Sequence, residues 1–306
     1  MRFEFQFGRS KTQVISEPGL LALQTVHPIL GELGHEAFLN FQTGTLVQWS
    51  DNAWGIQSET ELLGVFCFDQ AHALDRLAQE AYAKIFQLCR GKHIYRFWNF
   101  IRDINENGSN GIENYQNFCI GRSSAFAEYF QGSFQKHMPA ASAVGIPDDT
   151  LVVVFWAGDA APLYVENPNQ IPAYLYPEAY SPLPPSFARA TVCPEPSSGK
   201  SRFLISGTAS ISGHESLYRG DIARQLQLTL ENIELIYAEC AKQNNIASSS
   251  HCSDVRVYLR NAEDFECVQK HLEACWQNVA ERFVYVQADI CRSELLLEIE
   301  KTVQFY

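Results

Sequence analysis

Hydrophobic and polar residues follow a pattern that predicts the same series of helices and strands twice along the chain. In each series a helix, a strand and a second helix precede two more strands, and the two series lie roughly 150 positions apart. The first series is predicted over 73–89, 93–101, 112–130, 141–146 and 151–157, and the second over 221–240, 254–261, 262–279, 283–290 and 293–301. This repetition favours duplication of one unit in a mixed α/β (α+β) fold.

A proline-rich connector from Ala161 to Pro196 separates the two series. Its prolines exclude a regular helix, and its tyrosines are too many for a flexible linker, which is typically rich in glycine and serine. We therefore expect an ordered strap packed across the domain junction, with an extended surface tether as the alternative. Residues 1–70 hold three strand-like segments, 3–7, 44–49 and 59–68, which we expect to complete the sheet of the first unit.

Composition narrows the class of protein. With 306 residues, of which 46% are hydrophobic, the protein can bury a large core and is expected to form two or more domains. No apolar run could span a bilayer, and the first residues lack an apolar signal core, so a soluble cytoplasmic protein is expected. The nine cysteines include no CxxC pair, which argues against a disulfide framework and a zinc site. The net charge of -12 argues against nucleic acid but allows an anionic small molecule where arginines gather.

One carboxylate near the end of the chain, Glu298, lies among leucine and isoleucine residues. In a strand over 293–301, its neighbours Leu297 and Ile299 point to the opposite face. Partial burial of Glu298 at a domain junction would raise its pKa and suit it to act as a general acid. An ordinary surface carboxylate is the alternative.

Other candidate binding groups are weaker as single signals. A glycine-rich turn over 206–216 could present backbone N–H groups to an anion. Arg96, Arg122 and Arg189 each lie in an aromatic or polar motif rather than in a run of charges, and solvated surface arginines are the alternative. The dinucleotide-binding, P-loop and hydrolase-elbow motifs are absent, so neither a nucleotide cofactor nor an activated serine is indicated.

Several motifs resemble those of a known family. The segment from Phe187 to Tyr306 resembles RidA/YjgF proteins through ISGTASI, QLQLTLENIELIYAEC, VRVYLRNAEDF and a terminal LLLEIE. The whole chain resembles the chorismatase family, also labelled pteridine-dependent deoxygenase-like, through YRFWNFI, YQNFCIGR, ENPNQIPAYLYP, SFARA, SGTASISGHES and ADICRSELLLEIE, which occur in order. The resemblance implies tandem RidA/YjgF-like units in a pseudo-threefold arrangement, with an N-terminal portion over 1–70, a central domain over 71–165 and a C-terminal domain over 166–306.

The resemblance also implies an activity. Chorismatases remove the enolpyruvyl side chain of chorismate as pyruvate, and one type leaves 3-hydroxybenzoate, in some members with 4-hydroxybenzoate. By its place in ADICRSELLLEIE, Glu298 matches the family's proton donor, which would protonate the terminal methylene of the vinyl ether. The implied substrate-binding residues are Arg122 and Arg189, which would meet the two carboxylates, with Tyr115, Tyr176 and Gly207. No metal and no organic cofactor is implied.

Two positions bear on the product. A cysteine at the position of Cys291 tends to occur in benzoate-forming members of the family. An alanine at the position of Ala209 is typical of the hydrolytic type, which yields a dihydroxycyclohexadiene carboxylate. Both products therefore stay open. Cys291 is not expected to act as a nucleophile, because no His or Lys partner lies near it in the sequence.

Two other classes of function are alternatives. A RidA-like imine or enamine hydrolase would use the same glutamate with an arginine, but it would not need the tyrosine-rich strap. A non-catalytic binding module would tolerate the loss of Glu298. For the chorismatase we expect a monomer whose partner is the small molecule chorismate, with no nucleic acid and no membrane.

Overall fold

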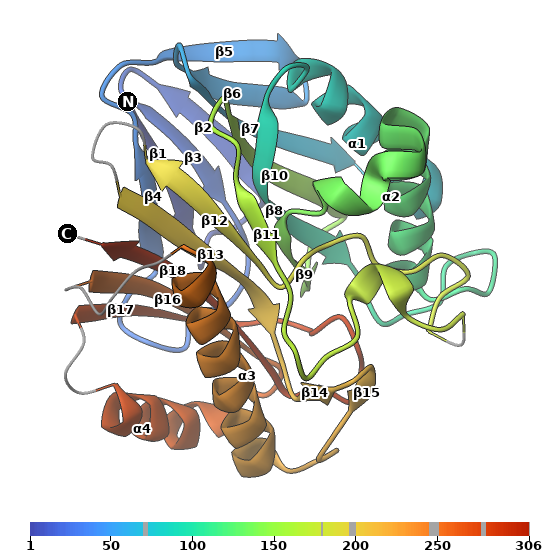
Figure 1. The fold of residues 1–306 in the computed structure, drawn as a ribbon, viewed down its shortest axis with the longest axis vertical. Helices are drawn as coiled ribbons and strands as arrows, with labels where there is room; N and C mark the ends of the chain where they lie inside the picture. The colour runs from blue at the N-terminus through green and yellow to red at the C-terminus, as the bar shows by residue number, and fades with distance from the viewer. Residues whose placement is uncertain (70–72, 179, 196–199, 245–250, 277–279, 306) are drawn as a thin grey trace.

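The computed structural model describes residues 1–69, 73–178, 180–195, 200–244, 251–276 and 280–305. Within these ranges the strands form three larger sheets and one short hairpin, and helices cover two of the larger sheets (Figure 1). The helices α1 (Leu74–Leu88) and α2 (Asn114–Phe130) lie on one side of the molecule, and α3 (Ile222–Gln243) and α4 (Phe265–Cys275) lie on another. No helix in the described ranges is long and apolar enough to cross a membrane.

The central unit contains a sheet whose described strands follow the order β5-β6-β7-β10-β8-β9. Its strands are β5 (Thr45–Ser50), β6 (Ala53–Gln57), β7 (Glu61–Asp69), β8 (His93–Arg102), β9 (Ala140–Ile146) and β10 (Thr150–Gly158). The helices predicted over 73–89 and 112–130 are confirmed as α1 and α2, which bury their apolar faces against this sheet. The 3-10 helix η1 (Gln131–His137) follows α2.

The C-terminal unit repeats this arrangement. Its described strands follow the order β11-β12-β13-β18-β16-β17, so that β13, β18, β16 and β17 take the places of β7, β10, β8 and β9. These strands are β11 (Leu163–Val165), β12 (Ala190–Glu195), β13 (Lys200–Thr208), β16 (His251–Leu259), β17 (Ala280–Gln287) and β18 (Leu297–Phe305). The 3-10 helix η3 (Ala262–Asp264) precedes α4, and residues 277–279 of the predicted helix lie outside the described residues. The mixed α+β fold of tandem units is confirmed.

The N-terminal residues form a separate sheet in the order β2-β3-β1-β4. Its strands are β1 (Arg2–Gln6), β2 (Gln13–Glu17), β3 (Leu20–Gln24) and β4 (His35–Asn40). The prediction that 3–7 joins the sheet of the first unit is wrong, because β1 pairs with β3 and β4. The other two predicted segments do join that sheet, as β5 and β7. The change from the N-terminal sheet to the central sheet falls between β4 and β5.

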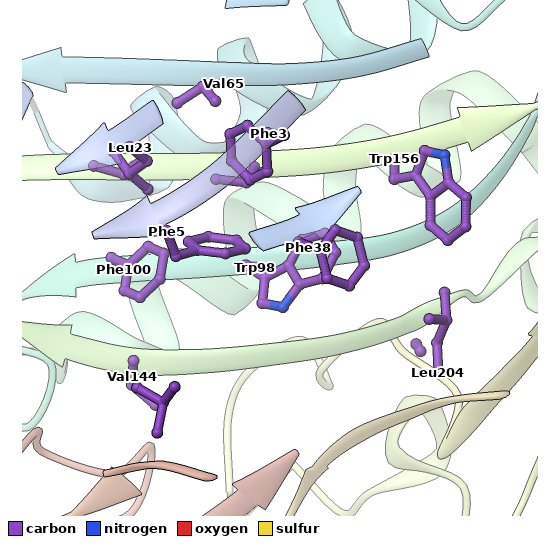
Figure 2. Close-up of a cluster of buried hydrophobic side chains, with 14 of the residues drawn as sticks. Phe3, Phe5, Leu23, Phe38, Val65, Trp98, Phe100, Val144, Trp156 and Leu204 are labelled. Carbon is purple, nitrogen blue, oxygen red and sulfur yellow. The ribbon is translucent and has the colours of Figure 1, made fainter. Parts of the chain in front are cut away.

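The three larger sheets share one hydrophobic core. Phe5 of β1 lies against Trp98 of β8, with ring centres 5.5 Å apart, and the ring of Phe38 in β4 lies 4.7 Å from the same indole (Figure 2). Leu204 of β13 joins this cluster from the C-terminal sheet. Further cores lie between the central sheet and α1 and α2, and between the C-terminal sheet and α3 and α4. Three sheets around one core agree with the predicted pseudo-threefold arrangement.

The proline-rich connector is an ordered strap across the junction, as predicted, except that its residues 179 and 196 lie outside the described residues. It contains β11 and the 3-10 helix η2 (Ala173–Leu175). The hydroxyl of Tyr164 donates to the carbonyl of Ile94 in β8 (3.0 Å), which ties the strap to the central unit. The Ile171 N–H donates to the carbonyl of Gly213 (2.9 Å), between the short strands β14 (Ile211–Ser212) and β15 (Glu215–Ser216) of the C-terminal unit.

Candidate active site

A cavity of about 170 Å³ lies at the junction of the central and C-terminal units. Its walls come from α2, β9 and β13, from the strap, and from the loop that precedes β18. The site residues predicted from the sequence all line this cavity: Tyr115, Arg122, Tyr176, Arg189, Gly207, Ala209, Cys291 and Glu298. The structure therefore brings them together, while their roles in binding and catalysis stay predictions.

Glu298 lies on β18 with its side chain toward the cavity. Its neighbours Leu297 and Ile299 pack in the core beneath α3, as the predicted alternation requires. The strand begins at Leu297 rather than at residue 293, because the preceding residues form a turn in which the Leu295 N–H donates to the carbonyl of Arg292 (3.0 Å). The predicted alternation of faces therefore holds only from Leu297 onward.

The carboxyl group of Glu298 is buried at the cavity wall. The residue is 3% exposed, so the alternative of a surface carboxylate is wrong. Its Oε1 atom has no hydrogen-bond partner among the described residues. Burial, together with the negative charge of Glu300, raises the pKa of Glu298 to about 8 against the opposing charge of Arg96. At neutral pH this group is a carboxylic acid with a proton to donate.

Gly207 makes room for this carboxyl group. A Cβ atom at position 207 would collide with Oε1 of Glu298 and would lie 3.1 Å from Cβ of Ser142. The pairing of β13 with β18 shifts register between Ile205 and Thr208, so the strand is irregular at this glycine. Any side chain here would displace the acid, which is a requirement that the sequence alone did not reveal.

Arg122 projects from α2 and is 3% exposed. Its guanidinium lies 5.2 to 6.0 Å from the centres of four aromatic rings, those of Tyr82, Phe97, Phe118 and Phe126. Its Nε and Nη2 atoms are buried and have no hydrogen-bond partner among the described residues. A buried cation without acceptors is unfavourable, so this arrangement favours an anion in the cavity.

Arg189 and Tyr176 form a second polar group on the cavity wall. Nη2 of Arg189 donates to the hydroxyl oxygen of Tyr176 (2.6 Å) and to the carbonyl of Ile171 (3.1 Å). Because the Tyr176 oxygen accepts this bond, its own proton is available for an acceptor in the cavity. Glu166 lies 4.0 Å from Nε of Arg189, and burial raises its pKa to about 7 against the charge of that arginine. The arginine is therefore only partly neutralised.

Tyr115, Cys291 and Ala209 shape the cavity without adding charge. Burial raises the pKa of Tyr115 and of Cys291 well above their usual ranges, and the charge of Glu298 adds to the effect on Cys291. Cys291 is thus a neutral thiol, which agrees with the prediction that it is not a nucleophile. Ala209 is buried, and its carbonyl accepts a hydrogen bond from Nδ2 of Asn232 (3.1 Å), which fixes the turn that carries its methyl group.

Arg292 also lines the cavity, and the sequence reasoning missed it. Its Nη1 atom donates to the carbonyl of His214 (2.8 Å) and to Oγ of Ser216 (3.1 Å), and its guanidinium lies 4.3 Å from the ring centre of Tyr180. It thereby ties the β14–β15 hairpin to the strap. The sequence signal that could have identified Arg292 as a site residue was its place in ADICRSELLLEIE, directly after Cys291.

Arg96, a candidate anion-binding residue in the sequence, is not among the residues that line the cavity. It is buried, with Nη2 donating to Oε2 of Glu300 (2.6 Å) and Nη1 donating to the carbonyl of Ile205 (2.6 Å). These donors are committed to the protein itself. Arg96 is therefore not placed to bind an anion in the cavity, and Arg122 and Arg189 stay the candidates.

The chain is similar to known proteins in sequence and in fold. Residues 41–157 match the family model described as chorismatase FkbO/Hyg5-like, N-terminal. A 3-hydroxybenzoate synthase from Streptomyces hygroscopicus is 36% identical over 233 residues, which cover 73% of this chain and 68% of the relative. A chorismatase from the same organism is 33% identical over 259 residues, which cover 82% of this chain and 74% of the relative.

The fold agrees over nearly the whole molecule. The crystal structure of a chorismatase matches with a TM-score of 0.84 and 27% sequence identity, covering 99% of this chain and 92% of that chain. The likeness therefore extends through the N-terminal sheet and both α+β units. On the sequence relatives and this structure together, the chain belongs to the chorismatase family.

Proposed function

We propose that this protein cleaves the enolpyruvyl ether of chorismate and releases pyruvate. The observation that carries the proposal is Glu298, a buried carboxylic acid with a pKa of about 8 whose unpaired Oε1 atom borders a cavity with two buried arginines. The relatives named 3-hydroxybenzoate synthase and chorismatase support the same class of reaction.

Chorismate carries two carboxylates, and the cavity offers a cationic group for each. Arg122 has two atoms, Nε and Nη2, without acceptors among the described residues. Arg189 likewise has an Nε atom without a hydrogen-bond partner there, and Tyr176 adds a hydroxyl donor beside it. Charge-assisted hydrogen bonds of this kind can hold a dianion locally, although the net charge of -12 repels anions at long range.

The chemical step is a proton transfer to carbon. The π electrons of the C=C bond in the enolpyruvyl group take the proton of Glu298 and form a C–H bond at the terminal methylene, which leaves a cation on the neighbouring carbon. The ether oxygen stabilises this cation. Water or a ring hydroxyl then adds to it and returns a proton to Glu298. After addition of water, the bond between the side-chain carbon and the ether oxygen breaks, the proton of the new hydroxyl passes to that ring oxygen, and pyruvate leaves. After addition of the ring hydroxyl, its own bond to the ring and the bond between the side-chain carbon and the ether oxygen both break, so that pyruvate leaves with the hydroxyl oxygen. The ring carbon that bears the ether oxygen then loses its hydrogen as a proton, which makes the ring aromatic, and that oxygen takes up a proton to become the phenol.

For the ring product we propose 3-hydroxybenzoate, in line with Cys291 and with the relative named 3-hydroxybenzoate synthase. This route balances without water, because pyruvate and 3-hydroxybenzoate together contain all the atoms of chorismate. Its isomer 4-hydroxybenzoate satisfies the same balance. Ala209 favours the hydrolytic product, which takes up one water instead. The neutral, partly buried thiol of Cys291 on the cavity wall supports exclusion of water from the cation.

Incubation of the purified protein with chorismate tests the activity and the product separately. Pyruvate, measured through coupled lactate dehydrogenase, reports the cleavage, and chromatography of the same mixture identifies the ring product. We expect equal amounts of pyruvate and 3-hydroxybenzoate. No pyruvate above the background without protein would contradict the activity, whereas a dihydroxycyclohexadiene carboxylate as the ring product would contradict only the product assignment.

We also propose that the protein works as a cytoplasmic monomer. The central and C-terminal units of the same chain supply the walls of the cavity, which supports a site that forms within one protomer. Light scattering of the purified protein and fractionation of the producing cells check these two statements. A stable dimer, or recovery outside the cytoplasm, would contradict them.

A further inference from the structure

Glu298 and Glu300 lie two positions apart on the same face of β18, and both are buried. Of the two, Glu298 lines the cavity. Glu300 contacts two arginines instead, with Arg96 Nη2 at 2.6 Å from its Oε2 atom and Arg256 Nη1 at 2.6 Å from its Oε1 atom. Two buried carboxyl groups at this spacing disfavour each other's ionised form, so one of them tends to keep its proton.

The two arginines hold Glu300 in its ionised form. Burial alone would raise the pKa of Glu300, but the charges of Arg256 and Arg96, with hydrogen bonds from Ser142 and Arg96, lower it below its ordinary value. Glu300 thus carries a fixed negative charge in the wall behind the cavity. The proton is left to Glu298.

Arg96 has no hydrogen bond to the acid that it could stabilise as an anion. Its Nη2 atom donates to Glu300 and its Nη1 atom donates to the carbonyl of Ile205. Oε1 of Glu298 has no hydrogen-bond partner among the described residues. Arg96 therefore acts on Glu298 through its charge alone.

Arg256 is committed to the far side of the same network. Its Nε atom donates to Oε2 of Glu36 (3.0 Å), and its Nη1 atom donates to the hydroxyl oxygen of Tyr258 (3.1 Å) besides contacting Glu300. Glu36 lies on β4, Arg256 on β16 and Arg96 on β8, so the network joins the three larger sheets. The overall fold fixes where the charge of Glu300 lies.

Titratable and charged groups face Glu298 from each element around it: Glu300 on β18, Arg96 on β8, Tyr258 on β16, Cys291 in the preceding loop, and Glu113, Arg122, Arg189, Arg292 and Glu294 around the cavity. Burial raises the pKa of Tyr258 and of Cys291 well above neutrality, so both are uncharged. Among the charges, that of Glu300 acts most strongly on Glu298 and favours its protonated form, and that of Arg96 follows and favours the anion.

We propose that Glu300 is a positioning residue, whose buried charge keeps Glu298 protonated before the reaction and draws a proton back to it afterwards, and that Arg96 limits this effect. The proposal rests on the role of Glu298 in the proposed function. When the acid gives its proton to the methylene carbon, its electron pair remains as an anion beside Glu300. The O–H bond of the attacking water or hydroxyl then breaks, and its proton relieves this repulsion by returning to Glu298.

Two substitutions of opposite sign test the proposal. Glu300→Gln removes the negative charge, so the descending limb of the pH profile of kcat/KM for pyruvate release should move to lower pH by about one unit or more. At pH values above the wild-type limb, kcat/KM should therefore be roughly tenfold lower than in the wild type. Arg96→Gln removes the positive charge while Arg256 still pairs with Glu300, so the limb should move to higher pH. A merely structural role would lower activity in both variants without moving their limbs in opposite directions.

Glu281→Gln is the matched control. Glu281 pairs with Lys301 (2.6 Å), a residue of β18 next to Glu300 and on the other face of the strand, so this substitution also removes a partly buried carboxylate partner of β18. It should leave the limb in place. A limb displaced as far as in Glu300→Gln would overturn the proposal, because the shift would then follow from disturbing the strand.

An infrared titration without chorismate separates this proposal from the proposed function. The carbonyl band of protonated Glu298, identified by its loss in Glu298→Gln, is titrated in the wild type, in Glu300→Gln and in Arg96→Gln. A lower midpoint in Glu300→Gln and a higher one in Arg96→Gln support the proposal even if chorismate is not the substrate. An unchanged or reversed midpoint in either folded variant would overturn it, and Arg96→Gln alone decides if Glu300→Gln does not fold.

Discussion

Glu298 and Arg122 are buried side chains whose states differ from those of surface residues. Glu298 keeps its proton at neutral pH, because burial and Glu300 raise its pKa to about 8. Arg122 has buried donor atoms without acceptors among the described residues. Both arrangements lower the stability of the free protein. An anionic substrate would accept hydrogen bonds from Arg122 and would take the proton of Glu298 on carbon. These two residues therefore support the proposed reaction best.

Gly207→Ala should lose most of its activity while staying folded. The new Cβ atom collides with Oε1 of Glu298, so the carboxyl group must move, and we expect kcat/KM to fall about 100-fold. The matched control is Gly132→Ala, where a Cβ atom meets nothing within 4 Å. Steady-state kinetics and circular dichroism of both variants check this. Wild-type activity in Gly207→Ala would contradict it.

Arg122→Met should separate binding from stability. Methionine can keep the contact with the aromatic rings but removes the unpaired buried charge, so the free energy of unfolding should stay level or rise by about 1 kcal/mol. Loss of a charged hydrogen-bond donor should raise KM for chorismate roughly tenfold to a hundredfold. Denaturant titration and kinetics measure the two effects, with the exposed Arg90→Met as control. A destabilised variant with unchanged KM would count against the anion-binding role.

The strand β18 contributes to the hydrophobic core with one face and carries the proposed catalytic acid on the other. Leu297 and Ile299 hold one face in the core beneath α3, and Glu298 and Glu300 occupy the other face. A strand fixed in a core gives a catalytic group little freedom to move. The apolar face therefore determines where the proton of Glu298 lies relative to the cavity.

The pH dependence of stability reports on this strand without substrate. Burial raises the pKa of Glu298 from 4.5 to about 8, so between these pH values the folded state holds a proton that the unfolded state has lost. The stabilising contribution of Glu298 is complete below about pH 4.5 and is lost as the pH rises through about pH 8.

Glu298→Gln cannot ionise, so its free energy of unfolding should rise relative to that of the wild type across this range, by roughly 1 kcal/mol per pH unit. Denaturant titrations of both proteins across this range measure the difference. A difference that does not change with pH would show that Glu298 ionises normally in the folded state.

Elements in which apolar residues recur at regular spacing could be predicted from the sequence, and irregular elements could not. The helices α1 and α3 show apolar residues at helical spacing, and their ends fall within a few residues of the predicted ones. The strand β1 shows ordinary alternation, but its pairing partners depend on tertiary contacts that alternation does not encode. The same holds for the room that Gly207 gives to Glu298, since that contact depends on a register shift between β13 and β18.

At the scale of the whole molecule, the site depends on how three sheets meet. The cavity lies at the junction of the central and C-terminal units, and the N-terminal sheet supports both through the shared core. The ion-pair network from Glu36 through Arg256 and Glu300 to Arg96 crosses the same junction. The family motifs could locate the site residues in the sequence, but this network has no spacing signal, because its members come from β4, β8, β16 and β18.

Phe5→Ala should therefore destabilise the whole protein in one step. Phe5 packs against Trp98, and the guanidinium of Arg256 lies 4.1 Å from its ring centre, so we expect a loss of about 3 kcal/mol or more. Circular dichroism and tryptophan fluorescence should report coincident transitions. The exposed Leu175→Ala is the control and should change little. Two separate transitions would contradict a shared core.

The most direct test of the central claim is the pH profile of kcat/KM for pyruvate release from chorismate by the wild type and by Glu298→Gln. If a buried carboxylic acid protonates the vinyl ether, the wild-type value should stay level at lower pH and fall tenfold per unit above about pH 8. Glu298→Gln should be folded and at least about 100-fold slower at every pH. A Glu298→Gln protein that keeps the wild-type rate, or a wild-type rate that rises through about pH 8, would contradict this mechanism.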